Sequence, residues 1–274
     1  MKFAVCFSGE TRYFNEHKKI SYGWEQLRIR LEEEGIAKLE FYGHTWEHCD
    51  DPEMDILRFR KYSKTDQVEI DEWVCNDFVM RAVTKQAWKK IPEFAQADIY
   101  GKIPIYLDMS RRGYGQFISA YKCWNMLEGN PDLCFRTRWD VELFDDYIEE
   151  LVEHCRGIKK GEWPYTSFNE QLYLLTTTCI GYGETSRNEP EDFLFAMRMY
   201  PGVVQKLKED PFRELEDTLM HAEKDKSTIT SHSLWETFFR KCDYTALPIF
   251  NHNMAKIFRP PGSVKTVDSN KWSI

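Results

Sequence analysis

The first part of the chain constrains the fold most, because two short apolar segments there flank an amphipathic one. Residues 2–7 (KFAVCF) form a β-prone run that ends in a Ser-Gly turn, and residues 38–43 (KLEFYG) form a second such run. Between them, apolar residues recur at helical spacing from Ile20 until Gly35 stops the pattern. Strand, helix and strand in this order predict a βαβ unit, and therefore a parallel sheet. Open sheets of this kind bind ligands at the carboxyl ends of their strands.

Later segments extend the pattern, although residues 51–100 give no clear assignment. We expect further helices over residues 110–127, 145–155, 191–200, 203–209, 218–226 and 231–241. We expect further strands over residues 133–144, 172–180 and 246–250. No repeat and no linker divides the chain, so the sequence predicts a single domain over residues 1–274.

The composition excludes several classes of protein. The net charge of -8 argues against a nucleic-acid partner, because neutralising phosphates requires a surplus of Lys and Arg. Aromatic residues make up 15% of the chain, which excludes intrinsic disorder. The eight cysteines show no CxxC pair, so we expect free buried thiols. With no long apolar run and no signal-peptide core, we expect a cytoplasmic protein without a membrane span.

One predicted strand carries an unusual row of charges. Over residues 133–144 the alternation places Arg136, Arg138, Asp140 and Glu142 on one face, which is unfavourable unless they meet a ligand or one another. Two carboxylates at this spacing could approach one hard cation, Mn²⁺ or Mg²⁺, which would bridge phosphate oxygens. The arginines would then contact the same phosphates or hold the carboxylates in place. The alternative is a surface strand laced with salt bridges.

Four motifs in register resemble small bacterial and phage-type GT-A glycosyltransferases. They are VCFSGETR at residues 5–12, GHTW at 43–46, the helix beginning at Gln116, and FRTRWDVELF at 135–144. The last of these stands where other GT-A enzymes carry their D-x-D. The resemblance covers about residues 3–200 in the right order and matches the tail only loosely.

This resemblance implies an α/β fold of the GT-A (Rossmann-like) type, with a mixed, mainly parallel sheet flanked by helices. It also implies transfer of a sugar from a nucleotide-diphosphate sugar, with UDP as the default, to an unidentified carbohydrate or other hydroxyl acceptor. Residues 1–145 would form the nucleotide-binding half, and residues 146–274 the acceptor-side half and C-terminal tail. If the chain is phage-encoded, it would act in the host cytoplasm.

The resemblance also assigns candidate site residues. At the nucleotide it implies Ser8, Gly9 and Arg12, with His44 and Thr45 beside them. Asp140 matches the metal-binding acidic residue, whereas Glu142 departs from the usual second Asp. His252 is the candidate third metal ligand, with His232 as second choice. Arg138 would help Asp140 and the metal to neutralise the departing diphosphate.

Other candidates come from their surroundings in the sequence. Arg111 and Arg112 precede a Gly-Tyr-Gly turn, and with Gln116 and Ser119 they could hold a pyrophosphate at a helix N-terminus; an ordinary solvated loop is the alternative. Asp192 is the carboxylate to test on the acceptor side, beside Glu191. Glu236 and Asp268 also stay open as the base that an inverting enzyme needs.

Three other functions remain open from sequence alone. A metal-dependent nuclease or phosphohydrolase would use Asp140, Glu142 and His252 to bind its cations. A module of the same fold that binds nucleotide or carbohydrate without turnover is the non-enzymatic alternative. The order His44-x-x-Glu47-His48 also occurs in one class of zinc peptidase.

Overall fold

The computed structural model describes a large part of the chain. The described residues are 1–53, 57–72, 113–162, 173–178, 190–199, 201–206, 210–224, 231–242, 244–250 and 255–257. Side-chain surroundings are described for most of these residues, but not for residues 173–178, 190–193, 201–202, 231–233, 245–250 and 255–257, among others.

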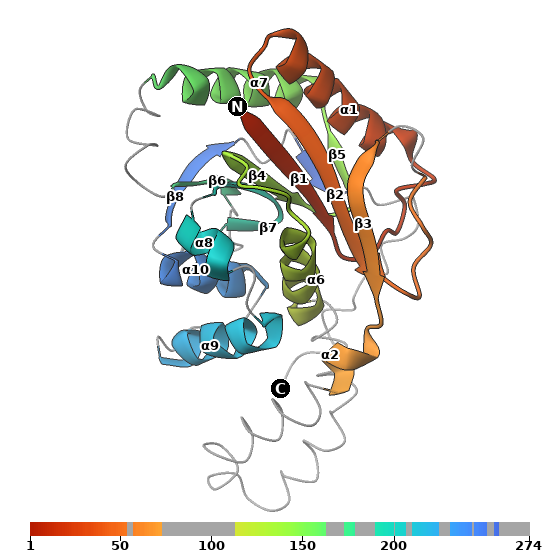
Figure 1. The fold of residues 1–274 in the computed structure, drawn as a ribbon, viewed down its shortest axis with the longest axis vertical. Coiled ribbons are helices and arrows are strands. Elements are labelled where there is room, and N and C mark those ends of the chain that lie inside the picture. The colour runs from red at the N-terminus through yellow and green to blue at the C-terminus, as the bar shows by residue number, and fades with distance from the viewer. Residues whose placement is uncertain are drawn as a thin grey trace, which may run out of the picture.

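Among the described residues, seven strands form one mixed sheet in the order β3-β2-β1-β4-β7-β6-β8 (Figure 1). All neighbours pair in parallel except β7, which runs antiparallel to both β4 and β6. The bounds are β1 Lys2–Ser8, β2 Lys38–Trp46, β3 Phe59–Thr65, β4 Leu133–Thr137, β6 Tyr173–Thr178, β7 Pro190–Arg198 and β8 Thr245–Phe250. The predicted mixed, mainly parallel sheet is confirmed.

Helices cover both faces of this sheet. Figure 1 shows α1 and α7 on one face and α6, α9 and α10 on the other. Their bounds are α1 Lys18–Glu33, α6 Tyr114–Asn125, α7 Asp145–Lys160, α9 Pro211–Lys224 and α10 Ser231–Lys241, with two short helices, α2 Val68–Glu72 and α8 Pro201–Lys206. A separate antiparallel pair joins β5 (Val141–Leu143) to β9 (Ala255–Ile257). The predicted fold class, with its flanking helices, therefore holds.

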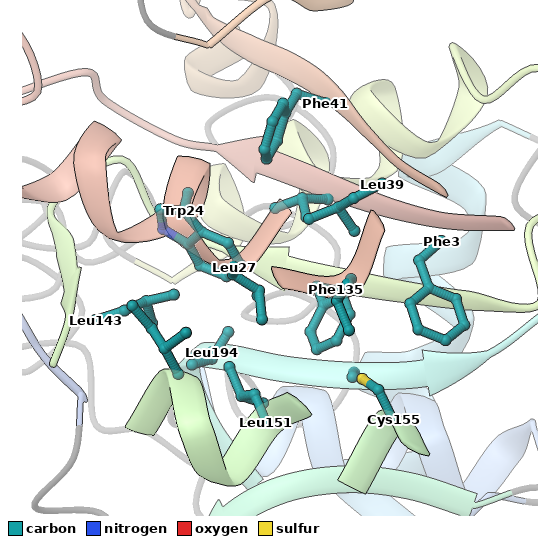
Figure 2. Packing of buried hydrophobic residues seen from close by; sticks show 14 of the residues in the cluster. Phe3, Trp24, Leu27, Leu39, Phe41, Phe135, Leu143, Leu151, Cys155 and Leu194 are labelled. Atoms are coloured by element: carbon teal, nitrogen blue, oxygen red, sulfur yellow. The ribbon is translucent and has the colours of Figure 1, made fainter. Parts of the chain in front are cut away.

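β1 is buried on both faces, which explains why it reads as a continuous apolar run. In β1, Phe3, Val5 and Phe7 face the cluster under α1 and α7, whereas Ala4 and Cys6 face the cluster under α6 and α10. Figure 2 shows the first cluster, in which Trp24 and Leu27 of α1 and Leu151 and Cys155 of α7 converge on Phe3 and Phe135 of the sheet.

The predicted strand over residues 133–144 is wrong in one respect, because it breaks in the middle. β4 ends at Thr137, and β5 starts at Val141 in the other sheet. Between them Trp139 turns into the core, where none of its surface is exposed. The four charged residues of this segment therefore do not share one face of one strand.

The predicted helix over residues 191–200 is also wrong, because this segment is β7. Residues 193–197 (FLFAM) are apolar at every position, which satisfies a helix and a doubly buried strand equally well. The structure decides for the strand, since β7 lies between β4 and β6 in the interior of the sheet. Leu194 to Met197 are all buried.

Other boundaries shift in ways that pairing explains. β2 continues through Trp46, because β3 pairs with it as far as Thr65. β3 escaped prediction since it is an edge strand whose side chains, such as Lys61 and Lys64, are charged and partly exposed. α7 runs on to Lys160 and stops at Gly161, whose φ of 67° is left-handed.

The cysteines for which a state is given, Cys6, Cys49, Cys123, Cys134, Cys155 and Cys242, are all free, as predicted. Burial raises the pKa of the Cys6 and Cys134 thiols well above the ordinary value, so both are protonated. Among the described helices, none is long and apolar enough to cross a membrane.

We predict that Gly43→Ala destabilises the fold by about 1–3 kcal/mol, because a Cβ at this position would lie 2.7 Å from Cη2 of Trp139. Unfolding in urea measures the loss. In a Trp139→Phe background the same change should cost much less, since the smaller ring frees the space. An equal cost in both backgrounds would contradict this account.

Candidate functional site

The candidate site lies where the order of the sheet reverses. β1 has β2 on one side and β4 on the other, so the carboxyl ends of β1 and β4 meet at a topological switch point, where open α/β sheets bind ligands. Two side-chain contacts join these ends. Nε of Arg136 donates to Oγ of Ser8 at 3.0 Å, and a terminal N–H of Arg12 donates to Oδ2 of Asp140 at 3.3 Å.

The turn after β1 has an unusual backbone. Gly9 has a φ of 104°, and Arg12 has a φ of 37°, which is uncommon for a residue with a side chain. The Gly9 N–H donates to Oγ of Ser119 on α6 at 2.7 Å. The structure therefore places the Ser8-Gly9 turn against Ser119 of α6.

A buried histidine connects this turn to the neighbouring strands. His44, on β2, lies 2.7 Å from Oγ of Ser119 through Nδ1 and 2.9 Å from Oγ1 of Thr65 through Nε2. Burial, reinforced by the positive charge of Lys122, lowers the pKa of His44 to about 3. The imidazole is therefore neutral at physiological pH, and it donates to one hydroxyl while it accepts from the other.

Asp140 is the centre of an ion-pair cluster. Its side chain is 1% exposed, and Arg138 donates to both of its oxygens, at 2.9 Å to Oδ1 and 2.6 Å to Oδ2. Arg12 adds a third bond to Oδ2 and also pairs with Glu10 at 2.9 Å. Although burial alone would lower the pKa of Arg12, the charges of Asp140 and Glu10 raise it above the ordinary value.

Arg136 points away from this cluster, to the other face of the sheet. It is completely buried, and its guanidinium lies 5.3 Å from the ring centre of Trp235 and 5.9 Å from that of Phe195. A terminal N–H donates to Oε1 of Gln116 at 3.4 Å. The sequence indicated Arg136 and Gln116, but not the two aromatic rings, because α10 and β7 lie far away along the chain.

Thr45 lies at the same edge of the sheet, on the opposite face of β2 from His44. Its hydroxyl is fully buried and has no hydrogen-bond partner among the residues that the structure describes. Buried hydroxyl groups are normally paired. Thr45 is one of the exceptions within the described part of the chain.

The described residues do not form a site for a divalent cation. Asp140 and Glu142 were expected to share the ion, but Asp140 is held by two arginines and Glu142 lies 3.5 Å from Nε2 of His17. Within the described ranges, no group of three His, Cys, Asp or Glu side chains is placed to hold a metal. This also applies to His44 and His48, because His44 belongs to a strand and contacts only hydroxyls through its ring nitrogens.

Several predicted residues cannot be placed in full. Arg111, Arg112, His252 and Asp268 lie outside the described residues. Asp192 is in β7, and because Leu194 pairs with Thr137 in antiparallel register, the start of β7 lies at the same sheet edge as the site. Glu236 and His232 are on α10.

No family model matches the sequence, and no similar sequence was found among curated proteins. Several solved glycosyltransferase structures are similar. Mouse xyloside xylosyltransferase 1 in its apo form matches with a TM-score of 0.44 and 10% identity, over 90% of this chain and 85% of that one. The galactosyltransferase LgtC, with donor and acceptor sugar analogs, gives 0.37 and 9%, over 90% and 73%. Glycosyltransferase GlyE of Streptococcus pneumoniae TIGR4 gives 0.37 and 12%, over 89% of this chain but only 45% of its own. At TM-scores below 0.5, these similarities assign neither an activity nor a substrate.

The buried His44 predicts a specific loss of stability in acid. Its pKa is about 3 in the folded protein and about 6.5 when unfolded, so below pH 6.5 only the unfolded chain takes up this proton. The free energy of unfolding should then fall by up to about 1.4 kcal/mol for each pH unit between pH 6 and 4.

Urea unfolding over this pH range tests the effect, with His44→Gln as the comparison. The carboxylates titrate in both proteins, so the difference between the two slopes isolates His44. Identical slopes would show that His44 takes up its proton without loss of stability.

Proposed function

We propose that this protein is a glycosyltransferase that binds a nucleotide-diphosphate sugar at the carboxyl ends of β1, β2 and β4. The observation that carries the proposal is the convergence, at the β1/β4 switch point, of a left-handed glycine turn and the Arg12 and Arg138 guanidiniums. A glycine lets the backbone approach a base or ribose closely. Guanidinium groups bind phosphate oxygens with paired N–H bonds.

The chemistry of glycosyl transfer fits these residues. As the bond between sugar and phosphate breaks, negative charge grows on the leaving nucleoside diphosphate, and positively charged donors fixed beside it stabilise this charge. Arg138 is held rigidly by two bonds to Asp140, so its remaining N–H groups are oriented before the donor arrives. The backbone of the Gly9 turn would hold the nucleoside part, beside the buried Ser8 and Thr45. UDP is the default nucleotide, and the acceptor is a hydroxyl group.

A divalent cation was expected at Asp140, Glu142 and His252, where it would supply further positive charge to the diphosphate. The described residues do not fit that assignment, as the contacts of Asp140 and Glu142 show. We therefore assign no step to a cation. The experiments below include Mn²⁺ as a separate condition.

The proposal is tested by thermal unfolding with UDP, GDP and CMP, each with Mn²⁺ and with EDTA. A ligand that binds the native state raises the melting temperature, and at a concentration of 100 Kd it adds about 2.7 kcal/mol of stability. We expect a nucleoside diphosphate to stabilise the protein more than CMP does. A bound nucleotide should then guide assays for sugar release from the matching donor. If no nucleotide stabilises the protein in either condition, the proposal is wrong.

The turn after β1 gives a mutational test with a matched control. Gly9→Ala meets no atom within 4 Å but forces alanine into a φ of 104°, and so should shift the turn and reduce nucleotide affinity about tenfold, or ~1.4 kcal/mol. Gly35→Ala also has free space and a φ of 63°, but it follows α1 at the other end of β2. Both changes should reduce stability by about 1 kcal/mol. Equal effects on nucleotide binding would contradict a site at the turn.

A further inference from the structure

The carboxylate of Asp140 is already engaged by the protein itself. It accepts three N–H bonds, two from Arg138 and one from Arg12, and it is 1% exposed. Three of the roughly four acceptor sites of this carboxylate are therefore in use. A divalent cation at the remaining site of Oδ1 would stand beside the Arg138 guanidinium, which is electrostatically unfavourable.

The cluster instead retains capacity to bind an anion. Arg12 and Arg138 carry two positive charges, which Asp140 and Glu10 balance. The side chains of Arg12 and Glu10 are 42% and 40% exposed, and exposed pairs of this kind contribute little, so an anion can compete with Glu10 for Arg12. Each guanidinium has five N–H donors. Arg138 uses two on Asp140, and its other donors have no partner among the described residues.

The backbone supports the same reading. Arg12 is the non-glycine residue with a positive φ among those described, and a conformation of this kind persists only where its surroundings enforce it. The side chain of Arg12 reaches Asp140, which lies on the far side of the switch point, 128 residues away in sequence. This bond of 3.3 Å joins the turn after β1 to the segment that follows β4.

We infer that Asp140 is a positioning residue, which holds Arg12 and Arg138 as a pair of phosphate-binding groups, and that this site binds the diphosphate of its nucleotide without a divalent cation. The inference rests on the proposed function, because the ligand is the donor named there. The sequence motifs suggested Asp140 as a metal ligand, whereas here Asp140 orients the two arginines.

The two roles predict opposite behaviour for Asp140→Asn. A metal ligand lost at this position would abolish nucleotide binding. A positioning carboxylate, once neutralised, leaves both positive charges in place, so UDP or GDP should bind in EDTA within about threefold of wild type. Turnover of the donor should nevertheless fall, because the arginines are no longer held in register, and so kcat drops while KM changes little.

Substitution of each arginine gives a second test of nucleotide binding. Arg138→Ala and Arg12→Ala should each weaken UDP or GDP binding in EDTA by about tenfold or more, as expected for a charged hydrogen bond. Glu149→Gln is the matched control, because it removes the carboxylate from another arginine pair, Arg30 with Glu149, on the exposed surface of α1 and α7. This control should bind nucleotide as wild type does, and circular dichroism checks that every variant is folded.

Isothermal titration with UDP and GDP distinguishes the outcomes. Binding in EDTA that survives Asp140→Asn and is weakened by both arginine changes supports the inference. Binding that requires Mn²⁺ and is lost in Asp140→Asn overturns the inference but leaves the proposed function intact. Absence of binding by wild-type protein with and without Mn²⁺ overturns both.

Discussion

The burial of Trp139 determines where the chain leaves the sheet. Its ring fills the space above Gly43 of β2, packs against Phe7 and Phe59, and donates its indole N–H to the carbonyl of His44 at 3.1 Å. A side chain of this size can enter the core only if the backbone turns there, which ends β4 two residues earlier. The residues on either side of the tryptophan, Arg138 and Asp140, are thereby presented at the sheet edge as a bidentate pair.

The opposite face of the sheet is fixed at the same edge by hydrogen bonds rather than by ring packing. Ser119 of α6 accepts from the Gly9 backbone and is bonded to His44, and His44 is bonded in turn to Thr65 of β3. This chain of contacts crosses three strands and one helix with neutral groups. Because neutral, mutually paired groups tolerate burial, the turn after β1 is held without placing another charge in the core.

The spacing of apolar residues along the sequence predicted the helices and strands whose burial is regular. It failed where a contact between residues far apart in the sequence determines the local structure. β1, α1 and the start of β2 follow from periodicity, because each buries faces that the sequence displays. β7 does not, since an all-apolar segment has no periodicity to distinguish strand from helix. The break at Trp139 was also invisible, because alternation of Arg136, Arg138, Asp140 and Glu142 describes an unbroken strand equally well.

The same limit applies to the site. The motifs identified Ser8, Gly9, Arg12, Arg136 and Asp140, and the structure places all of them near the end of β1 or β4. Their partners could not be predicted, because no local signal links Glu142 to His17, or Arg136 to a ring on α10. Sequence motifs can identify the chemical groups at a sheet edge, but only the fold determines which of these groups form ion pairs with each other.

The antiparallel strand β7 has a consequence for synthesis of the protein. β3, β2, β1 and β4 all lie within residues 2–137, so these strands can pair as soon as that part has left the ribosome. The strand that covers β4, residues 190–198, is made more than fifty residues later. Until it arrives, β4 presents unpaired backbone groups, which are a template for pairing with another nascent chain. The yield of folded protein should therefore depend on how fast the ribosome translates this interval, and on chaperones that shield the exposed edge.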